Sequence, residues 1–378
     1  MLDAIRADDH VEALRLPVNQ LQQILDRLSQ QGFRTLGPTL TDSVVTIADI
    51  SQVEQLPRGV VDDQQPGVYR AKQTDAPNYF KFNLGADSWK RHLFPSRRLL
   101  FETGPDLIAT SHSVNHQPPL AFLGVRACDL LAMSIQQKVF DRVDDHYQRQ
   151  LAEAFIIGVH CQSAAATCFC PSTGSGPEFT DSRNLDLLLT EIVTHAEHFF
   201  LVEARSTRAI ELLAPLNLAA AKPEEKELIT AQLQATRSQI RKSLPADTYD
   251  LLRDNLDAAR WDNVAERCLS CGNCTFVCPT CFCSDVEDHT DIEGNTAQRW
   301  QVWDSCFHQG HSYTHAGTVR ETTRARYRQW LTHKLSTWYD QFDTSGCTGC
   351  GRCITWCPVG IDLTEEVAAI SHEASHEK

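Results

Sequence analysis

Apolar runs in the first half of the chain have the periods of alternating helices and strands. Apolar residues at 21–28 fall on one helical face, and Gly32 follows where such a helix would end. The pattern at 129–140 also predicts a helix. Short, nearly continuous apolar runs predict buried strands at 44–47, 120–125, 155–159, 185–189 and 199–202. Helices that alternate with such strands predict an α/β domain over residues 1–205.

The rest of the chain changes character. Pro223, followed by two glutamates, is typical of a helix start, and a second helical stretch runs toward Trp261. Residues 206–265 therefore predict a helical connector, with a partner-docking hairpin as the alternative. Residues 320–339 predict a solvated helix that packs its aromatics inward, an interpretation we favour over a nucleic-acid site. We expect residues 266–378 to form a mainly helical, ferredoxin-type dicluster domain.

Two cysteine runs in that last region share one spacing. Residues 268–279 read Cys-x2-Cys-x2-Cys-x3-Cys-Pro, and residues 347–358 repeat the pattern. In two-cluster ferredoxins the first three thiolates of such a run bind one [4Fe–4S] cube and the fourth binds the other. Gly272, Gly349 and Gly351 suit the tight loops that this requires. Zinc ribbons, the alternative, use two cysteine pairs rather than a triplet followed by Cys-Pro.

The spacing therefore predicts two [4Fe–4S] clusters, and the cross-over between the runs assigns their ligands. The first cube takes one thiolate from the second run, giving the set Cys268, Cys271, Cys274 and Cys357. The second cube takes the complementary set, Cys347, Cys350, Cys353 and Cys278.

Four further cysteines lie in the predicted α/β domain. Cys128 and Cys161 each follow a predicted strand, and Cys168 and Cys170 come later in the same loop as Cys161. In parallel sheets, ligands collect beyond the carboxyl ends of the strands. The four thiols therefore predict a third [4Fe–4S] cluster, with buried free cysteines as the alternative.

Cys281, Cys283 and Cys306 have no assigned partner. They could bind a further cluster, replace one of the N-terminal ligands, or line the dicluster domain, and the sequence does not choose among these. Histidines follow Cys306 with the spacing of one helical face, at positions 308, 311 and 315. We favour solvent-exposed histidines over a metal site there.

The composition limits which partners, compartments and cofactors we expect. A chain of 378 residues is long enough for two domains, and its formal charge of −14 argues against nucleic acid. The fifteen cysteines gather in ligand-like runs, which favours a reducing, cytoplasmic compartment over a secreted disulfide scaffold. The first residues lack the apolar core of a secretory signal, and no apolar run is long enough for a membrane span. No dinucleotide fingerprint follows a strand, so neither flavin nor NAD is expected on this chain.

The segments 271–283, 303–306 and 347–358 resemble the iron–sulfur β subunit of cytoplasmic sulfhydrogenases, which are NAD(P)-linked [NiFe] hydrogenases. The A subunit of anaerobic sulfite reductase is similar. Gly-Val-Arg-Ala-Cys-Asp at 124–129 and Thr-Cys-Phe-Cys at 167–170 also resemble that family, as does the segment that ends in Leu-Phe-Pro at Pro95. The resemblance implies a relay of electrons between a flavin subunit that handles NAD(P)H and a terminal [NiFe] or siroheme subunit.

The leading hypothesis is thus a non-catalytic electron-transfer subunit of an oxidoreductase complex, with no catalytic residue of its own. One alternative is a subunit of an anaerobic sulfite reductase. Another is an enzyme that reduces sulfur or polysulfide at an extra cluster bound by Cys281, Cys283 and Cys306. A scaffold whose clusters serve only structure is the third.

Overall fold

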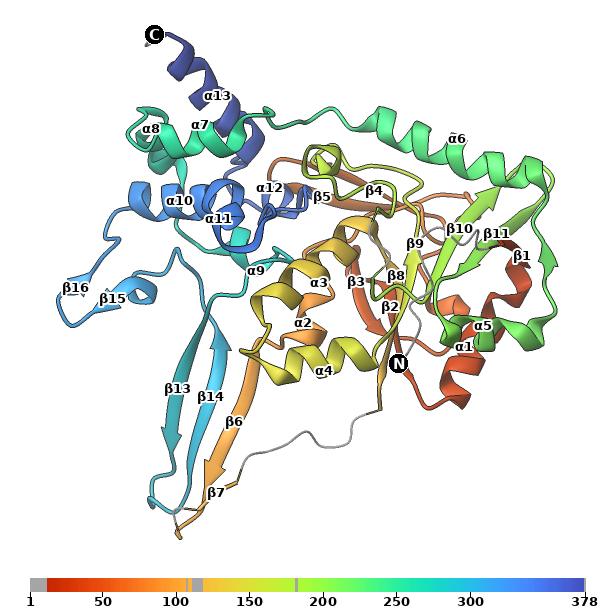
Figure 1. The fold of residues 1–378 in the computed structure, drawn as a ribbon, viewed down its shortest axis with the longest axis horizontal. Coiled ribbons are helices and arrows are strands. Elements are labelled where there is room, and N and C mark those ends of the chain that lie inside the picture. Colours follow the sequence, from red (N-terminus) through yellow and green to blue (C-terminus); the bar gives the residue numbers. More distant parts are fainter. Residues whose placement is uncertain (1–11, 107, 111–117, 181–182, 377–378) are drawn as a thin grey trace.

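An eight-stranded sheet organises the N-terminal half of the molecule (Figure 1). The computed structural model describes residues 12–106, 108–110, 118–180 and 183–376. The strands of the sheet, in spatial order, are β12 (Ala219–Ala220), β1 (Leu14–Pro17), β11 (His198–Ala204), β10 (Leu187–Val193), β9 (Phe155–Val159), β8 (Leu120–Val125), β2 (Arg34–Thr41) and β3 (Val44–Asp49). The strands β10, β9, β8 and β2 run parallel, and antiparallel strands complete both edges.

The two central strands have the bounds that the apolar runs predict. All five residues of β9 are buried, and so are the last five of β8. Strands covered on both faces read as continuous apolar runs, which explains why the sequence revealed them. Between them lie the helices α3 (Ala127–Val139) and α4 (Asp145–Glu153). Because β8 and β9 are parallel, their carboxyl ends lie at the same edge of the sheet.

Helices complete this half of the chain. They are α1 (Leu21–Gln30), α2 (Lys90–Leu93) and α5 (Thr207–Leu213). The predicted apolar stripe of α1 is buried and joins the core of the sheet. In α1, four apolar residues at helical spacing face the same side and are buried. Their burial packs the helix against β2, which it contacts.

The connector consists of α6 (Pro223–Gln239), α7 (Thr248–Asp254) and α8 (Arg260–Arg267). The single helix expected to run toward Trp261 is wrong, because Asn255 interrupts it. The Asn255 side chain donates to the Leu251 carbonyl at 2.8 Å, and its own carbonyl accepts a bond from Trp261 Nε1 at 2.8 Å. These bonds close α7 and redirect the chain into α8.

The cysteine-rich region has a second apolar core, built largely from residues 251–370. Its helices are α9 (Asn273–Phe276), α10 (Thr323–Thr332), α11 (Trp338–Phe342), α12 (Arg352–Thr355) and α13 (Leu363–His376), with a π-helical turn at His333–Thr337. Where a helix at 320–339 was expected, α10, this turn and the start of α11 follow one another, and Tyr327, Trp330 and Trp338 are buried. No described helix is both long and apolar enough to cross a bilayer.

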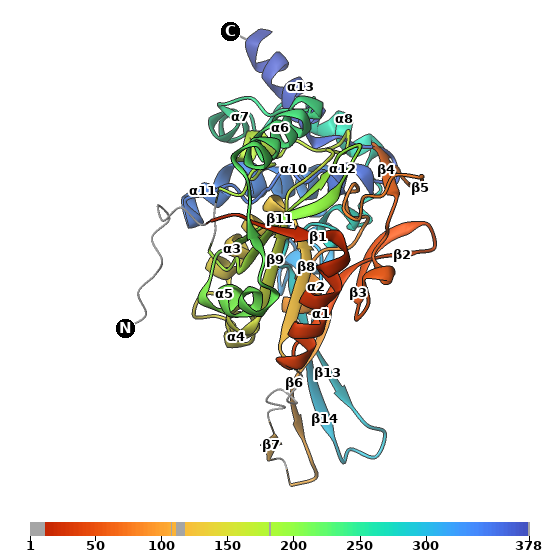
Figure 2. The ribbon, with the colours of Figure 1, turned by 90° about the vertical axis from the view of Figure 1, so that its right-hand side faces the viewer.

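A β-ribbon that the sequence did not predict projects from the body, on the side opposite α13, in two perpendicular views (Figures 1 and 2). Its strands are β13 (Ser284–Thr290), β14 (Ala297–Trp303), β6 (Arg97–Thr103) and β7 (Ala109–Thr110). The ribbon escaped prediction because β13 is acidic and exposed and carries no apolar alternation. The region 266–378 therefore contains a sheet as well as helices.

A hairpin joins the two halves of the chain. It comprises β4 (Val60–Gln65) and β5 (Val68–Gln73), and it contacts α12. Tyr69 stacks on Trp356 with 5.6 Å between the ring centroids, and Gly67 N donates to the Ile354 carbonyl at 3.1 Å. The hairpin thus holds the second cysteine run against the N-terminal domain.

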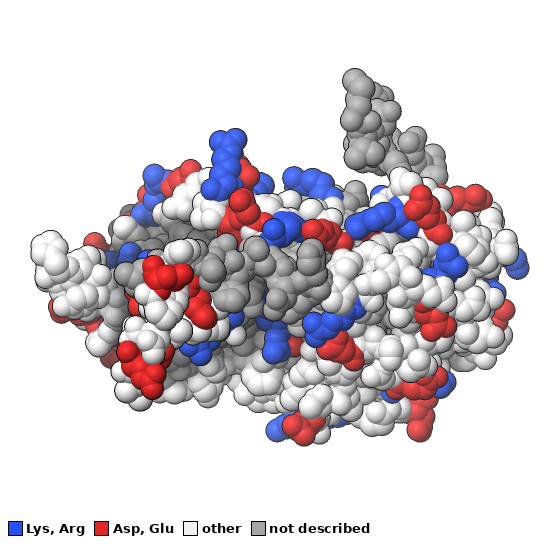
Figure 3. All heavy atoms as spheres, turned by 90° about the horizontal axis from the view of Figure 1, so that it is seen from below, with Lys and Arg blue, Asp and Glu red and all other residues white. Residues whose placement is uncertain are grey.

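On the surface seen in Figure 3, acidic and basic side chains are interspersed among uncharged ones.

Candidate metal centres

The two cysteine runs fold into the same backbone turn. Gly272 and Gly351 have φ of +77° and +75°, and each precedes a one-turn helix, α9 or α12. Those helices carry the third cysteine of each run, Cys274 and Cys353. Glycine is needed before each helix because other residues rarely adopt this left-handed conformation. One spacing in the sequence therefore yields one local geometry, twice.

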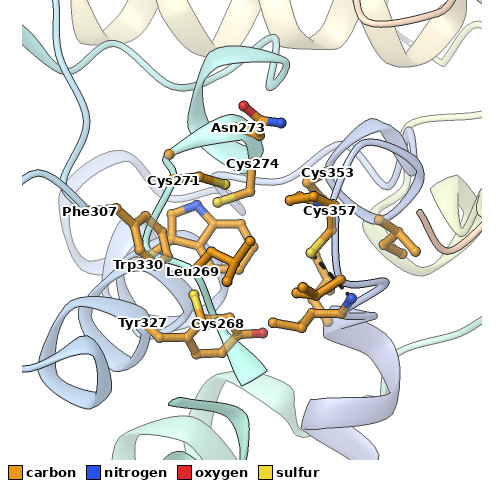
Figure 4. A pocket seen from close by; sticks show the side chains of 16 residues that line it. Cys268, Leu269, Cys271, Asn273, Cys274, Phe307, Tyr327, Trp330, Cys353 and Cys357 are labelled. Atoms are coloured by element: carbon orange, nitrogen blue, oxygen red, sulfur yellow. Dashed lines mark hydrogen bonds between the residues drawn. The ribbon is translucent and has the colours of Figure 1, made fainter. Parts of the chain in front are cut away.

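The first cavity is lined by cysteines from both runs (Figure 4). Cys268, Cys271 and Cys274 come from the first run, and Cys357 comes from the second. These are the four thiols assigned to the first cube, and the fold brings them together across about 80 residues of sequence. Cys353, assigned to the second cube, also lines this cavity. Their ligation of iron remains a prediction.

Main-chain N–H groups point at the sulfur atoms of this cavity. Ser270 N donates to Cys268 Sγ at 3.4 Å, and Ile361 N donates to Cys357 Sγ at 3.3 Å. Hydrogen bonds of this kind stabilise negative charge on sulfur and help set cluster potentials. Phe307, Tyr327 and Trp330 form an apolar, aromatic part of the wall (Figure 4).

Burial raises the pKa of the Cys274 thiol well above its usual range, and it also raises the pKa of Cys268. Such thiols lose their protons readily only when a cation takes the proton's place. The donor set is therefore soft, and its more enclosed thiols need positive charge, which fits iron in a cube.

The second predicted set lies between the two halves of the molecule, with Cys278 and Cys347 buried and Cys350 and Cys353 half-buried. Electrostatic interactions link the Cys353 thiol with those of Cys347, Cys278 and Cys350. Gly349 N donates to Cys347 Sγ at 3.4 Å. The fold thus also gathers the four thiols assigned to the second cube.

A buried cation contacts this second set. Lys334, on the π-helical turn, is 3% exposed, and its Nζ lies 3.3 Å from Cys278 Sγ. The ammonium also donates to Thr280 Oγ1 at 2.9 Å and to the Gly346 carbonyl at 3.1 Å. Negative charge on neighbouring thiols raises the pKa of Lys334 despite its burial, so the ammonium stays charged. A positive charge in contact with a cluster ligand stabilises the reduced cluster.

The four N-terminal cysteines surround another cavity at the carboxyl edge of the sheet. Cys128 lies just beyond β8 and Cys161 just beyond β9, and Cys168 and Cys170 line the same cavity. Burial raises the pKa of all four thiols. Cys350 of the second set forms part of the wall. The predicted third set is therefore brought together, next to the second.

Close packing holds this cavity against the second run. A Cβ added to Gly349 would lie 2.6 Å from the main-chain nitrogen of Cys170, and one added to Gly351 would lie 2.4 Å from the Thr167 carbonyl oxygen. Phe169 N donates to the Gly349 carbonyl at 2.8 Å. These glycines serve close backbone approach as well as the turn itself.

Two arginines fix the walls of the same cavity. Arg352 forms a buried, two-pronged ion pair with Asp129, at 2.8 and 3.2 Å. Arg126 donates to four main-chain carbonyl groups, those of Phe80, Phe82, Val159 and His160. Arg126 thereby ties the chain after β9 to the segment before α2.

The cysteines that had no assigned partner lie elsewhere. Cys281, Cys283 and Cys306 line a third cavity, together with His311 and Lys334, and none of them lines the N-terminal cavity. They therefore lie apart from the four N-terminal thiols. The histidines after Cys306 do not share a helix, because Gly310–Ser312 is a single 3-10 turn that leads into a short hairpin, β15 (Tyr313–Thr314) and β16 (Gly317–Thr318).

Within the described ranges, no three His, Cys, Asp or Glu side chains are placed to hold a single metal ion. The thiols instead line cavities. Sequence reasoning missed Lys334, Arg352 and Lys90 as neighbours of the thiols. Lysine and arginine are usually exposed, so no pattern marked these residues as buried.

Comparisons with known proteins agree with this geometry. Residues 267–361 match the family described as a 4Fe-4S dicluster domain. Sulfhydrogenase 2 subunit beta of Pyrococcus furiosus is 32% identical over 248 residues, which cover 63% of this chain and 70% of that protein. The chain belongs to the sulfhydrogenase beta subunit family.

Membership of the family confirms the resemblance seen in the sequence. A sulfhydrogenase beta subunit with a dicluster domain is an iron–sulfur protein with an electron-transfer role, and it contains [4Fe–4S] clusters. The match to the beta subunit is much longer than the dicluster domain, so the family covers more than the ferredoxin-type motifs.

Proposed function

We propose that this chain relays single electrons between a subunit that handles flavin and NAD(P)H and a terminal catalytic subunit such as a [NiFe] hydrogenase. The name of the Pyrococcus furiosus relative supports assembly with other hydrogenase subunits. We place the complex in the cytoplasm and include neither nucleic acid nor a membrane among its partners.

The observation that carries the proposal is the continuity of the thiol sets. Cys353 interacts with the other second-set thiols and lines the first cavity, and Cys350 lines the N-terminal cavity. The second set therefore adjoins both of the others. Three neighbouring cofactors in this order would form a path for electrons, with the second cube in the middle.

A [4Fe–4S] cluster, when bound, gives or accepts one electron at a time. The residues of the chain hold it and tune it. Phe307, Tyr327 and Trp330 exclude water from one side of the first cavity. Lys334 supplies positive charge beside Cys278, and N–H groups donate to the sulfurs of both runs.

The first cavity is the natural place for exchange with a partner. Cys271 is exposed, whereas Cys278 and Cys347 of the second set are buried. Electron transfer between proteins requires cofactors to come close together, so the cube nearest the surface is the one that a partner reaches first. We therefore assign entry or exit of electrons to the Cys271 side.

The test is anaerobic purification of the native complex and of the isolated chain. A flavoprotein and a nickel protein that co-purify with the chain would support the hydrogenase relay. A siroheme protein in place of the nickel protein would favour the sulfite reductase alternative. The isolated chain should show reducible cluster signals but should oxidise neither NADPH nor H2. Turnover of either substrate by the isolated chain would overturn the relay.

The cavity around Cys281, Cys283 and Cys306 favours a second candidate function, the reduction of sulfur or polysulfide by this chain itself. The variant Cys306→Ala separates the two functions. An enzyme would lose polysulfide reduction while its other clusters stay intact, whereas a relay has no such activity to lose.

A further inference from the structure

The third cavity contains three cysteines that none of the predicted clusters uses. Cys281 and Cys283 precede β13, and Cys306 follows β14. The antiparallel register of these strands pairs Ser284 with Trp303, and Asp304 N donates to the Cys283 carbonyl at 2.9 Å. The base of the β-ribbon therefore brings together cysteines from the two ends of the hairpin. Cys283 and Cys306 both line the third cavity, as does Cys281.

A histidine completes the ring of soft donors. His311 lines the same cavity as the three thiols. Its Nδ1 lies 2.6 Å from Asp304 Oδ2. Metal-bound histidines usually show this arrangement, in which a carboxylate holds one ring nitrogen and fixes the other toward the metal. In His311 the Nε2 atom remains for a ligand.

Buried positive charge lies around the same thiols. Lys90 is 4% exposed, and its Nζ contacts the Cys281 carbonyl at 3.2 Å and the Trp303 ring at 3.9 Å. Lys334 is buried on another side of the cavity. Neither ammonium forms an ion pair with a carboxylate of the described residues. Buried cations are costly unless negative charge compensates them, and thiolates on a cluster would provide it.

The cavity also has room. Its volume is about 340 Å³. A single ion would not need this space, and the donors are not placed around one point. A cube, whose four irons each take one ligand, suits donors spread around a larger space.

We propose that this cavity binds an additional [4Fe–4S] cluster, held by Cys281, Cys283 and Cys306 with His311 Nε2 as the fourth ligand. Histidine replaces cysteine in other iron–sulfur centres, so the mixed set is chemically sound. This cofactor site does not depend on which partners the chain serves.

The site adjoins the second cube. Lys334 and Cys281 line the third cavity, and Lys334 Nζ lies 3.3 Å from Cys278 Sγ of the second set. One electron would pass from the reduced second cube, which becomes oxidised, to the oxidised additional cube, which becomes reduced. No bond is made or broken. The second cube would then be a branch point rather than the middle of a single path.

The test uses the full chain, purified anaerobically, with iron and sulfide counted per chain. We expect Cys306→Ala to contain four fewer iron atoms than the unaltered protein, while the EPR signals of the other clusters persist. An unchanged iron content in this variant would overturn the proposal, and so would zinc in place of the additional iron.

A second measurement does not depend on how Cys306→Ala folds. Pulsed EPR of the unaltered, reduced protein should show coupling to an imidazole nitrogen. His311→Cys should keep the iron and lose this coupling. His308 also contacts Asp304 but does not line the cavity, so His308→Asn should change neither the iron content nor the nitrogen coupling. Absence of the nitrogen coupling in the unaltered protein, or its persistence in His311→Cys, would refute the assignment of His311.

Discussion

The two cysteine runs have the same spacing and the same turn, yet their surroundings differ. The first run lies at the surface, where Cys271 is exposed and aromatic side chains form the wall. The second run is enclosed, with Cys347 buried, Lys334 against its partner Cys278, and Arg352 paired to Asp129. Local sequence therefore specifies how a cube is held, whereas the tertiary fold specifies its electrostatic environment and its neighbours.

We expect the largest effect on iron content, and we expect it to differ between variants of the third cysteine in each run. Cys274 belongs to the first set and lines the first cavity, whereas Cys353 belongs to the second set and also lines the first cavity. We expect Cys274→Ala to lose one cube, which is four iron atoms, and Cys353→Ala to disturb both cubes. Iron analysis with EPR spin counting measures this. Full iron content in Cys274→Ala would show that the assignment is wrong.

The residue before that third cysteine gives the next comparison. Arg352 is buried and paired with Asp129, whereas Asn273, its counterpart in the first run, makes one exposed bond to the Trp356 carbonyl. Arg352→Ala leaves a buried carboxylate unpaired, so we expect a loss of about 3–5 kcal/mol in the free energy of unfolding.

Asn273→Ala is the matched control, with an expected loss of about 0.5–1.5 kcal/mol at most. Anaerobic urea denaturation of the cluster-loaded protein measures both variants. Equal losses in the two would mean that the second run is no more embedded in the fold than the first.

The glycines at the start of α9 and α12 sharpen the comparison further. An alanine at either position costs about 1–2 kcal/mol, because both require the left-handed conformation. At Gly351 the new Cβ would also lie 2.4 Å from the Thr167 carbonyl oxygen, which is main chain, whereas at Gly272 it would lie 2.9 Å from Ser305 Oγ, which is a side-chain atom. We expect Gly351→Ala to be the more destabilising and to reduce the occupancy of the Cys128 cavity. Thermal unfolding followed by cluster absorbance would detect the difference, and a larger loss in Gly272→Ala would contradict the account.

The last contrast between the two runs is electrostatic. Removing the Lys334 ammonium in Lys334→Met should lower the potential of the second cube by about 65–130 mV, from about 1.5–3 kcal/mol for a hydrogen bond to a charged group. The first cube should shift much less. Lys334→Arg should preserve most of the potential, and Lys226→Met, at an exposed lysine, should change nothing. Potentiometric EPR measures all three, and equal shifts in both cubes would remove the electrostatic distinction between the runs.

The sequence predicted what depends on local patterns. Strands β8 and β9 were predicted at their observed bounds because each is a continuous apolar run, and the cysteine spacing grouped the thiols of the first cavity. The β-ribbon was missed because β6 and β14 pair across about 200 residues, and β13 is acidic rather than apolar. Lys334 and Arg352 were missed because their burial follows from tertiary packing, which no local pattern reveals.

A redox titration of the anaerobically purified chain, followed by EPR and iron analysis, tests the central claim most directly. The account predicts at least eight iron atoms per chain and two distinguishable, reducible cubes, with the cube beside Lys334 reduced at the higher potential. Zinc in place of iron, or cubes that stay inert from strongly oxidising to strongly reducing potentials, would contradict it.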